Sequence, residues 1–265
     1  MTSLSRLQKS WECFAQIDPL WAICADPAMR GNQWTEKEFF DTGRREIGRV
    51  LEYLQTLELV PAKSQIALDF GCGVGRLTSA LSAHFDQCWG LDISPTMIER
   101  AKSFHHSNPR CTFEVNQADN LRRFAGGTFG FIYTSIVLQH IARGLAEKYL
   151  LEFVRVLKPG GVLLFQIPDR DKTSAIRRMK IKSIIGIQSR WHRLLKRKRM
   201  EAFSMEMHCM REDEIRKLLS GQNVRIVDVK LTNSTDGAFD GNLQFLNEEP
   251  QSGFVSKQYC VVKRG

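Results

Sequence analysis

Glycines at alternate positions follow a short apolar run near residue 70. The run is Ile66–Phe70, and the glycines are Gly71, Gly73 and Gly75. Glycine tolerates positive φ and, because it has no Cβ, lets a ligand approach the backbone. The apolar positions after Gly75 continue at helical spacing. The segment therefore predicts a strand that turns through glycines into a helix, with free N–H groups beside a ligand at the carboxyl edge of a sheet.

A carboxylate at the end of the next predicted strand indicates what this ligand carries. The strand is Gln87–Asp92, and an acid at its end suits a ribose diol. A nicotinamide-binding fingerprint, Gly-x-Gly-x-x-Gly, would also require glycine at the sixth position counted from Gly71. This chain has Arg76 there. The spacing therefore argues against a nicotinamide cofactor.

The pattern Asp-x-Gly-x-Gly-x-Gly, which begins at Asp69, resembles motif I of the class I S-adenosylmethionine-dependent methyltransferases. Asp92 matches the ribose-binding acid of that family, and Val156–Leu164 resembles its turn into the fifth strand. The resemblance covers roughly Ala62–Pro168 and favours the small-molecule type. It implies S-adenosyl-L-methionine as the cofactor.

The resemblance also assigns cofactor contacts in the first half of the domain. The glycine backbone would approach the cofactor, Asp69 would help to hold its ammonium group, and Ile93 would cover one face of the adenine. Alternatively, Asp69 satisfies N–H groups of the turn and Ile93 belongs to the core. The implied cofactor-binding residues in this half are Asp69, Gly71, Cys72, Gly73, Gly75, Asp92 and Ile93.

The partner of the adenine edge is open. Where the family often has Asp-Ala after the third strand, this chain has Gln117 and Ala118, followed by Asp119. Either Gln117 or Asp119 could accept from the adenine amino group, and the N–H of Ala118 could meet a ring nitrogen. This departure from the family pattern leaves the partner of the adenine undecided, but it does not change the prediction that the adenine pocket lies here.

A histidine follows the fourth predicted strand, where substrate and methyl group meet in the resembling family. It is His140, and Ser135 at the start of the same segment is predicted to contact the cofactor. His140 is the candidate general base for an acceptor that must lose a proton. The alternative is a histidine that caps a helix or packs in the core.

The alternation of strands and helices from Gln65 onward predicts an α/β fold with a doubly wound, mostly parallel, seven-stranded sheet. Residues 1–61 are expected to form a helical extension or lid, and residues 62–265 the methyltransferase domain, with a basic helical insertion at 169–209. Scattered cysteines without a CxxC pair argue against a metal site or disulfide framework and favour the cytoplasm.

The positive charge of the chain lies in one segment. The formal net charge is +9, whereas Arg170–Arg199 contains twelve basic residues and one acid, so it carries 12 − 1 = +11 and the remainder carries 9 − 11 = −2. An amphipathic pattern around Trp191 allows three interpretations: a lid helix, contact with an anionic membrane or phosphate-bearing lipid-linked substrate, or contact with nucleic acid. Trp191 is the single tryptophan of this segment, and it favours a membrane over RNA, because a platform that stacks bases needs more aromatic residues.

These observations predict a methyltransferase that acts on a small-molecule, sugar-linked or lipid-linked acceptor. An RNA methyltransferase is the first alternative. The absence of an Asn-Pro-Pro-Tyr or Asp-Pro-Pro-Tyr tetrad after the fourth strand argues against methylation of base amino groups. A protein that binds the cofactor without catalysis is the alternative from another class.

Overall fold

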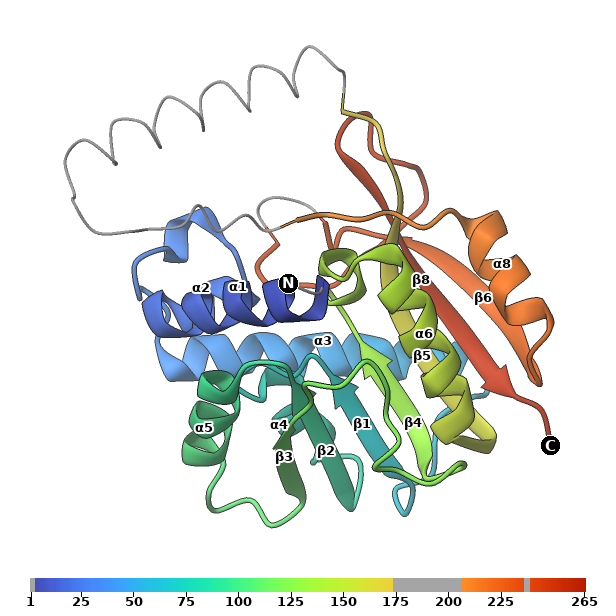
Figure 1. The fold of residues 1–265 in the computed structure, drawn as a ribbon, viewed down its shortest axis with the longest axis horizontal. Coiled ribbons are helices and arrows are strands. Elements are labelled where there is room, and N and C mark those ends of the chain that lie inside the picture. Colours follow the sequence, from blue (N-terminus) through green and yellow to red (C-terminus); the bar gives the residue numbers. More distant parts are fainter. Residues whose placement is uncertain (1–2, 174–205, 236–238) are drawn as a thin grey trace.

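The computed structural model describes residues 3–173, 206–235 and 239–265. In this part of the chain, strands and helices alternate from β1 onward (Figure 1). The strands are β1 (Ile66–Phe70), β2 (Gln87–Asp92), β3 (Cys111–Val115), β4 (Phe129–Thr134), β5 (Leu157–Asp171), β6 (Val224–Thr232), β7 (Phe245–Leu246) and β8 (Phe254–Lys263). The helices are α1 (Ser3–Ile17), α2 (Pro19–Ile23), α3 (Glu36–Thr56), α4 (Arg76–Leu81), α5 (Pro95–Phe104), α6 (Arg143–Val156) and α8 (Glu212–Ser220), with short 3₁₀ turns at Pro27–Met29 and Leu138–His140.

The sheet confirms the predicted α/β class and corrects its strand count. The described strands form one sheet in the order β3-β2-β1-β4-β5-β8-β6-β7, which has eight members where seven were predicted. The additional member is the short β7, which pairs with the end of β6. Strands β1 to β5 run parallel, and β8 pairs antiparallel with both β5 and β6. The last strands of the chain therefore close the mostly parallel sheet with antiparallel pairs.

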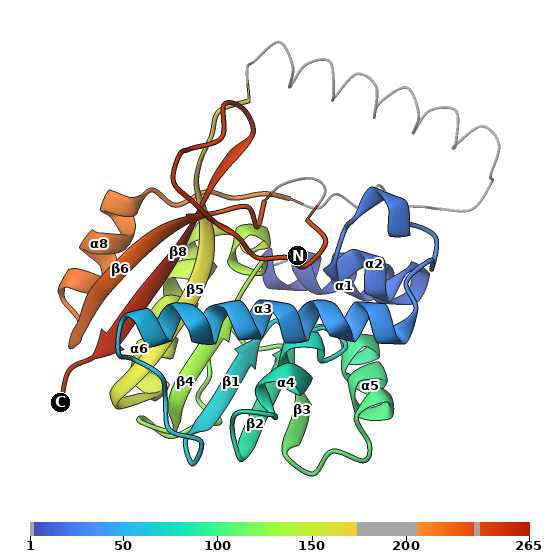
Figure 2. The same cartoon turned by 180° about the vertical axis from the view of Figure 1, so that it is seen from behind.

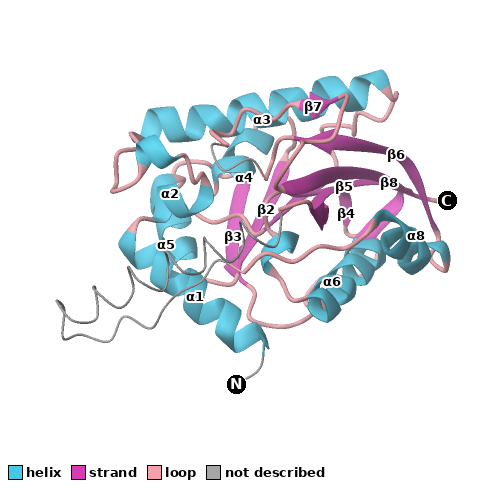
Figure 3. Ribbon diagram, turned by 90° about the horizontal axis from the view of Figure 1, so that it is seen from above, coloured by secondary structure: helices cyan, strands magenta, loops and turns pink. Residues whose placement is uncertain are grey.

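Helices cover both faces of the sheet, as Figure 3 shows from above. Helices α3 and α4 pack on one face, and α6 and α8 pack on the other. Along β5, alternate residues serve the two layers: Leu163 and Phe165 join the α6 side, whereas Val162 and Leu164 join the α3 side. This alternation follows from the two-residue period of a strand and buries β5 on both faces.

The N-terminal helices extend this layered body beyond the strand ends. Helix α3 begins with a capping box between Thr35 and Glu38. Helix α1 lies beyond the carboxyl ends of the parallel strands (Figures 1 and 2). Its Glu12 carboxylate accepts hydrogen bonds from the Ser94 hydroxyl at 2.6 Å and from the Thr96 backbone N–H and hydroxyl. These bonds fix α1 to the start of α5.

The observed elements modify the expected boundaries. Helix α3 shares a core with the sheet, so residue 61 does not separate two hydrophobic cores. Strand β5 extends to Asp171, so the first residues of the predicted 169–209 insertion belong to the sheet. Residues 174–205, which hold most of the basic segment, lie outside the described part of the chain.

Candidate functional site

A cavity opens at the carboxyl ends of β1, β2 and β4. It holds about 910 Å³ of empty space, part of it open to solvent. The turns after β1 and β4 and the end of β2 form its floor, and the helices α1 and α2 contribute Leu7, Trp11, Ala22 and Ile23 as a cover. Ligands of open α/β sheets bind at this edge. Most of the lining side chains are apolar.

The predicted glycine turn forms part of this floor. Gly71, Gly73 and Gly75 all have positive φ, at +80°, +53° and +88°. A Cβ on Gly71 would lie 2.3 Å from the Val137 side chain, and one on Gly73 would lie 2.4 Å from the Ile23 side chain. Both positions therefore need glycine, because the neighbouring walls of the cavity approach the bare backbone.

The backbone N–H groups of the turn bond to other protein groups, contrary to the prediction. They were expected to be free for a ligand, but those of Gly71 and Cys72 donate to Leu91 O at 2.7 and 3.0 Å. The N–H of Gly73 donates to Asp92 Oδ2 at 2.9 Å. The turn is thereby closed onto the end of β2. The surface that it offers to a ligand comes from the missing Cβ atoms.

Asp92 supplies the carboxylate of the cavity. Its Oδ1 accepts from the Ser94 N–H at 2.8 Å, and its Oδ2 accepts from Gly73 as described. Burial raises the pKa of this carboxyl group, and the backbone hydrogen bonds from Ser94 and Gly73 oppose that rise. Two carboxylate oxygens offer about four acceptor sites, so the group retains capacity for the hydroxyls of a ligand.

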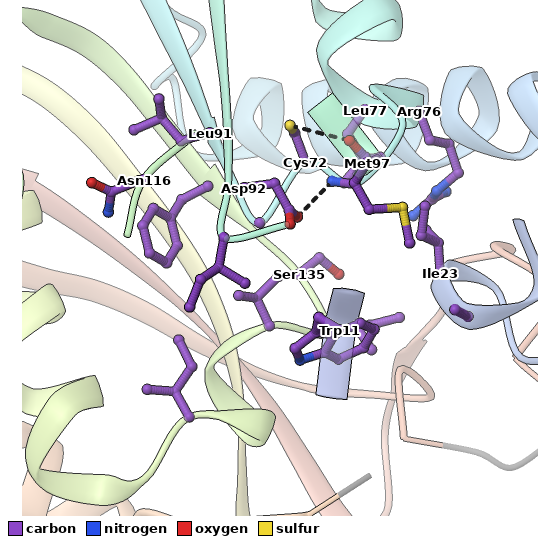
Figure 4. Close-up of a pocket in the computed structure, with 18 of the residues that line it drawn as sticks. Trp11, Ile23, Cys72, Arg76, Leu77, Leu91, Asp92, Met97, Asn116 and Ser135 are labelled. Atoms are coloured by element: carbon purple, nitrogen blue, oxygen red, sulfur yellow. Dashed lines mark hydrogen bonds between the residues drawn. The ribbon is translucent and has the colours of Figure 1, made fainter. Parts of the chain in front are cut away.

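Two further polar residues, Ser135 and Arg76, line the cavity. Ser135 is buried, and its hydroxyl lies near the Tyr133 side chain. Figure 4 shows Asp92, Ser135 and Trp11 around the same space. Arg76 is buried, pairs with Glu46 at 2.7 Å and leaves its Nε unpartnered. An unpartnered buried polar atom of this kind is rare.

Two of the other residues predicted at the cofactor, Asp69 and Gly75, lie apart from the cavity lining. Asp69 is buried and accepts a 2.6 Å hydrogen bond from the Thr78 hydroxyl. Burial raises its pKa to about 7, against the opposing effect of that bond. This partner, Thr78, is a residue of α4 and not one of the turn N–H groups named as the alternative, and the cofactor role of Asp69 stays a prediction. Gly75 is also outside the lining, at the N-cap of α4, whereas Cys72 and Ile93 line the cavity.

The segment after β3 places different residues at the cavity from those predicted. Gln117 and Ala118 are exposed, and the Asp119 carboxylate pairs with Lys148 at 2.7 Å. The lining residues on this side are Asn116 and Tyr149. The Tyr149 hydroxyl and the Asn116 amide both donate to Ala118 O, at 2.5 and 3.3 Å. Asn116 could have been found as a polar residue that directly follows a strand. The resemblance to the family pattern instead selected the next residues, Gln117 and Ala118.

His140 lies behind the cavity wall, with both ring nitrogens in hydrogen bonds. Nε2 contacts the Gln139 amide nitrogen at 3.1 Å, and Nδ1 contacts Glu206 O at 2.9 Å. An amide nitrogen can only donate and a carbonyl oxygen can only accept. His140 is therefore neutral with its proton on Nδ1. Its ring also packs edge-on against Trp11, with 5.2 Å between centroids.

This arrangement makes the general-base role of His140 costly, and that role stays a prediction. The Nε2 lone pair would have to leave Gln139 before it could take a proton from an acceptor. Burial lowers the His140 pKa to about 4, although the bond to Glu206 O opposes the shift. The packing alternative named from the sequence describes the observed contacts.

The lowered pKa of His140 predicts a loss of stability in acid. Between pH 6.5 and about 4, His140 is protonated in the unfolded chain but neutral in the folded protein. The stability that neutral His140 contributes is therefore complete above pH 6.5 and decreases as pH falls. The two pKa values, 6.5 and about 4, correspond to ~3 kcal/mol. Urea unfolding of the wild type and His140→Gln should therefore show a stability difference that changes by ~2–3 kcal/mol between pH 7 and 4.5, in the direction that favours the variant in acid.

The comparison with the variant is necessary because Asp69 acts in the opposite direction. With its pKa raised to about 7, folded Asp69 binds a proton that the unfolded chain releases, so its effect lowers stability as pH rises. That effect is common to both proteins and cancels in the difference. Parallel stability curves for the wild type and His140→Gln would contradict a neutral, buried histidine.

Comparison with known proteins gives these positions a family context. The sequence model of a methyltransferase domain family matches residues 68–165. An uncharacterized methyltransferase of Synechocystis is 33% identical over 109 residues, which make up 41% of this chain and 49% of that protein. Trans-aconitate 2-methyltransferase of Methylobacterium radiotolerans is 33% identical over 129 residues, 48% of this chain and 47% of that protein. The chain thus spans about half the length of each of these relatives.

Solved structures extend the similarity of fold to nearly the whole chain. The structure of magnesium protoporphyrin IX methyltransferase of Synechocystis, with bound SAH, aligns over 99% of this chain and 100% of that protein, with 15% identity and a TM-score of 0.62. The structure of an S-adenosylmethionine-dependent methyltransferase of Leishmania major aligns over 98% of this chain and 82% of that protein, with 14% identity and a TM-score of 0.61. Because the family match spans the glycine turn, Asp92 and the start of β5, the resemblance found in the sequence is confirmed over residues 68–165, which match a methyltransferase domain family. The solved structures show that the chain shares the fold of these S-adenosylmethionine-dependent methyltransferases.

Proposed function

We propose that this protein transfers a methyl group from S-adenosylmethionine to a small-molecule, sugar-linked or lipid-linked acceptor. The observation that carries the proposal is the cavity at the carboxyl ends of β1, β2 and β4. It combines a carboxylate on Asp92, the polar residue Ser135 and the bare backbone of Gly71 and Gly73 under an apolar cover. A ribose diol, the polar end of a methionine and an adenine ring would find complementary groups there.

Different residues of the cavity would contact different parts of the cofactor. Asp92 would accept from the ribose hydroxyls, and Ile93 beside it would cover the adenine. Gly71 and Gly73 would leave room for the chain that carries the sulfonium. Asn116, which sequence reasoning did not select, lies on the adenine side of Asp92 in this assignment because it follows β3, the neighbour of β2.

The contribution of this chain to methyl transfer would be mainly positional. The bound cofactor supplies an activated methyl group, which the acceptor attacks in line. Holding two reactants in that geometry is worth up to ~7–11 kcal/mol. The cover formed by α1 and α2 would orient the acceptor and exclude water, since Leu7, Trp11 and Ile23 present apolar surface to the cavity.

The lining of the cavity favours a small or apolar acceptor over RNA. Among the described residues that line it, Arg76 is the only cation, and its charge is paired with Glu46 inside the protein. A groove that follows RNA phosphates needs exposed Lys and Arg side chains. The relative named trans-aconitate 2-methyltransferase carries a small-molecule name. Cofactor binding without transfer remains the alternative from another class.

Contact of the basic segment with an anionic membrane remains part of the proposal. Its described residues Arg170 and Lys172 both pair with Glu249, at 2.5 and 2.7 Å. Most of Arg170–Arg199 lies outside the described residues. No helix in the described ranges has the length and apolar character needed to cross a bilayer. Any membrane contact would therefore be proposed at the surface, where each Lys or Arg adds ~1 kcal/mol of attraction to anionic lipid.

The role of Asp92 can be separated from that of Asp119 by matched substitutions. Asp92→Asn should weaken binding of S-adenosylhomocysteine by ~1.5–3 kcal/mol, because a charged hydrogen bond in a desolvated site is lost. Asp119→Asn should change the affinity little, because that carboxylate is exposed and pairs with Lys148. Isothermal titration of both folded variants measures this. Equal losses would place Asp119 at the adenine, and an unchanged affinity in Asp92→Asn would remove Asp92 from the site.

Methyl transfer itself can be tested with labelled cofactor. The purified protein is incubated with methyl-labelled S-adenosylmethionine and separate water-soluble, lipid and RNA fractions of a cell extract. Label should pass to the water-soluble or lipid fraction, and Asp92→Asn should lower the rate. Label in RNA alone would overturn the proposed acceptor class. Cofactor binding without transfer to any fraction would favour a non-catalytic role.

A further inference from the structure

The segment that follows β4 contains an unusual backbone conformation at the cavity. Ile136 has φ +61°, in the left-handed region. A β-branched residue is a genuine outlier there, because its side chain crowds the backbone. Such conformations persist only where the surrounding structure enforces them, and they cluster at functional sites. Ser135, Ile136 and Val137 all line the cavity.

A fully buried glutamine on β5 holds this conformation. The backbone N–H of Ile136 donates to Gln166 Oε1 at 2.9 Å, and Gln166 is 0% exposed. Since a backbone N–H can only donate, the amide oxygen of Gln166 must face Ile136. The amide nitrogen therefore faces the other way, where it donates to Gln139 Oε1 at 3.2 Å and to Ser256 Oγ at 2.8 Å. Every polar atom of the Gln166 side chain is thus committed.

The conformation of Ile136 determines which groups reach the cavity. It follows directly on Ser135, which lines the cavity (Figure 4). On its other side, Val137 packs so closely on Gly71 that a Cβ there would lie 2.3 Å from Val137 Cγ2. The Thr134 hydroxyl anchors the end of β4 to Phe70 O at 2.9 Å, so the turn begins from a fixed point. A change of φ at Ile136 would move Ser135 and Val137 in relation to the glycine turn.

We infer that Gln166 is a positioning residue of the cofactor pocket, which holds Ile136 in the left-handed conformation and so fixes Ser135 and Val137 against Gly71. Gln166 is absent from the cavity lining and acts through the Ile136 N–H. This inference rests on the proposed function, because it concerns the affinity of the same cavity for S-adenosylmethionine and its product. Without Gln166, the N–H would lose its acceptor and the turn would relax to negative φ.

A double-mutant cycle separates this role from a contribution to general stability. The four proteins are the wild type, Gln166→Leu, Ile136→Gly and the double variant, each titrated with S-adenosylhomocysteine by calorimetry. Gln166→Leu should raise Kd by ~10-fold or more, which lies within the range of strain stored at such residues. Glycine adopts positive φ without strain. Ile136→Gly in the Gln166→Leu background should therefore recover most of the lost affinity.

Ser256→Ala provides the matched control. Ser256 is buried and bonds to the same Gln166 amide nitrogen, but it makes no hydrogen bond to Ile136. Its replacement should lower the melting temperature while leaving Kd within ~2-fold, since surrounding polar contacts affect mainly stability. The inference would be overturned if the Kd of the Gln166→Leu variant were unchanged. It would also be overturned if the fold-losses of affinity of the two single variants multiplied in the double variant. Failure of the wild type to bind S-adenosylhomocysteine would instead overturn the proposed function.

Discussion

The buried ion pair between Arg76 and Glu46 joins the glycine turn to the helical N-terminal part. Arg76 Nη2 lies 2.7 Å from Glu46 Oε2, with side chains 3% and 0% exposed, and the Tyr133 hydroxyl donates to the other Glu46 oxygen at 2.7 Å. Removal of one partner from such a pair costs ~3–5 kcal/mol, because a charge is left buried. A Cβ on Gly43 would lie 2.4 Å from Arg76 O, so α3 and α4 also approach closely. The position of α3 over the sheet is therefore set at the residue that follows the turn.

The two walls of the cavity depend on different polar contacts. On the side of the cover, the Glu12 carboxylate holds α1 at the start of α5, and Ile23 on α2 packs onto Gly73. On the side of β4, Gln166 accepts from Ile136 and Val137 packs onto Gly71. Each wall thus meets a bare glycine backbone, and each is fixed by a partly or fully buried side chain that carries several hydrogen bonds. This explains how a largely apolar cavity can keep a defined shape at the edge of the sheet.

The sequence predicted the parts of this structure that depend on local pattern. The glycine turn and Asp92 at the end of β2 need only neighbouring residues, so spacing was sufficient. The eighth strand was missed because Phe245–Leu246 is two residues long and pairs only through tertiary contact. Arg76 entered the sequence argument only as a missing glycine, and its pairing with Glu46 joins positions 30 residues apart. His140 was selected by its place after β4, whereas its burial and its bonds to Gln139 and Glu206 depend on the folded chain.

The central claim is that the cavity recognises S-adenosylmethionine and not a dinucleotide, although both use a glycine turn and an acid at the end of the second strand. Arg76 occupies the position of the third dinucleotide glycine, and its side chain is committed to the interior. The most direct measurement is isothermal titration of the wild-type protein with S-adenosylhomocysteine and, separately, with NAD. We expect saturable binding of S-adenosylhomocysteine at one site and no heat of binding with NAD. Saturable NAD binding without a response to S-adenosylhomocysteine would contradict the claim.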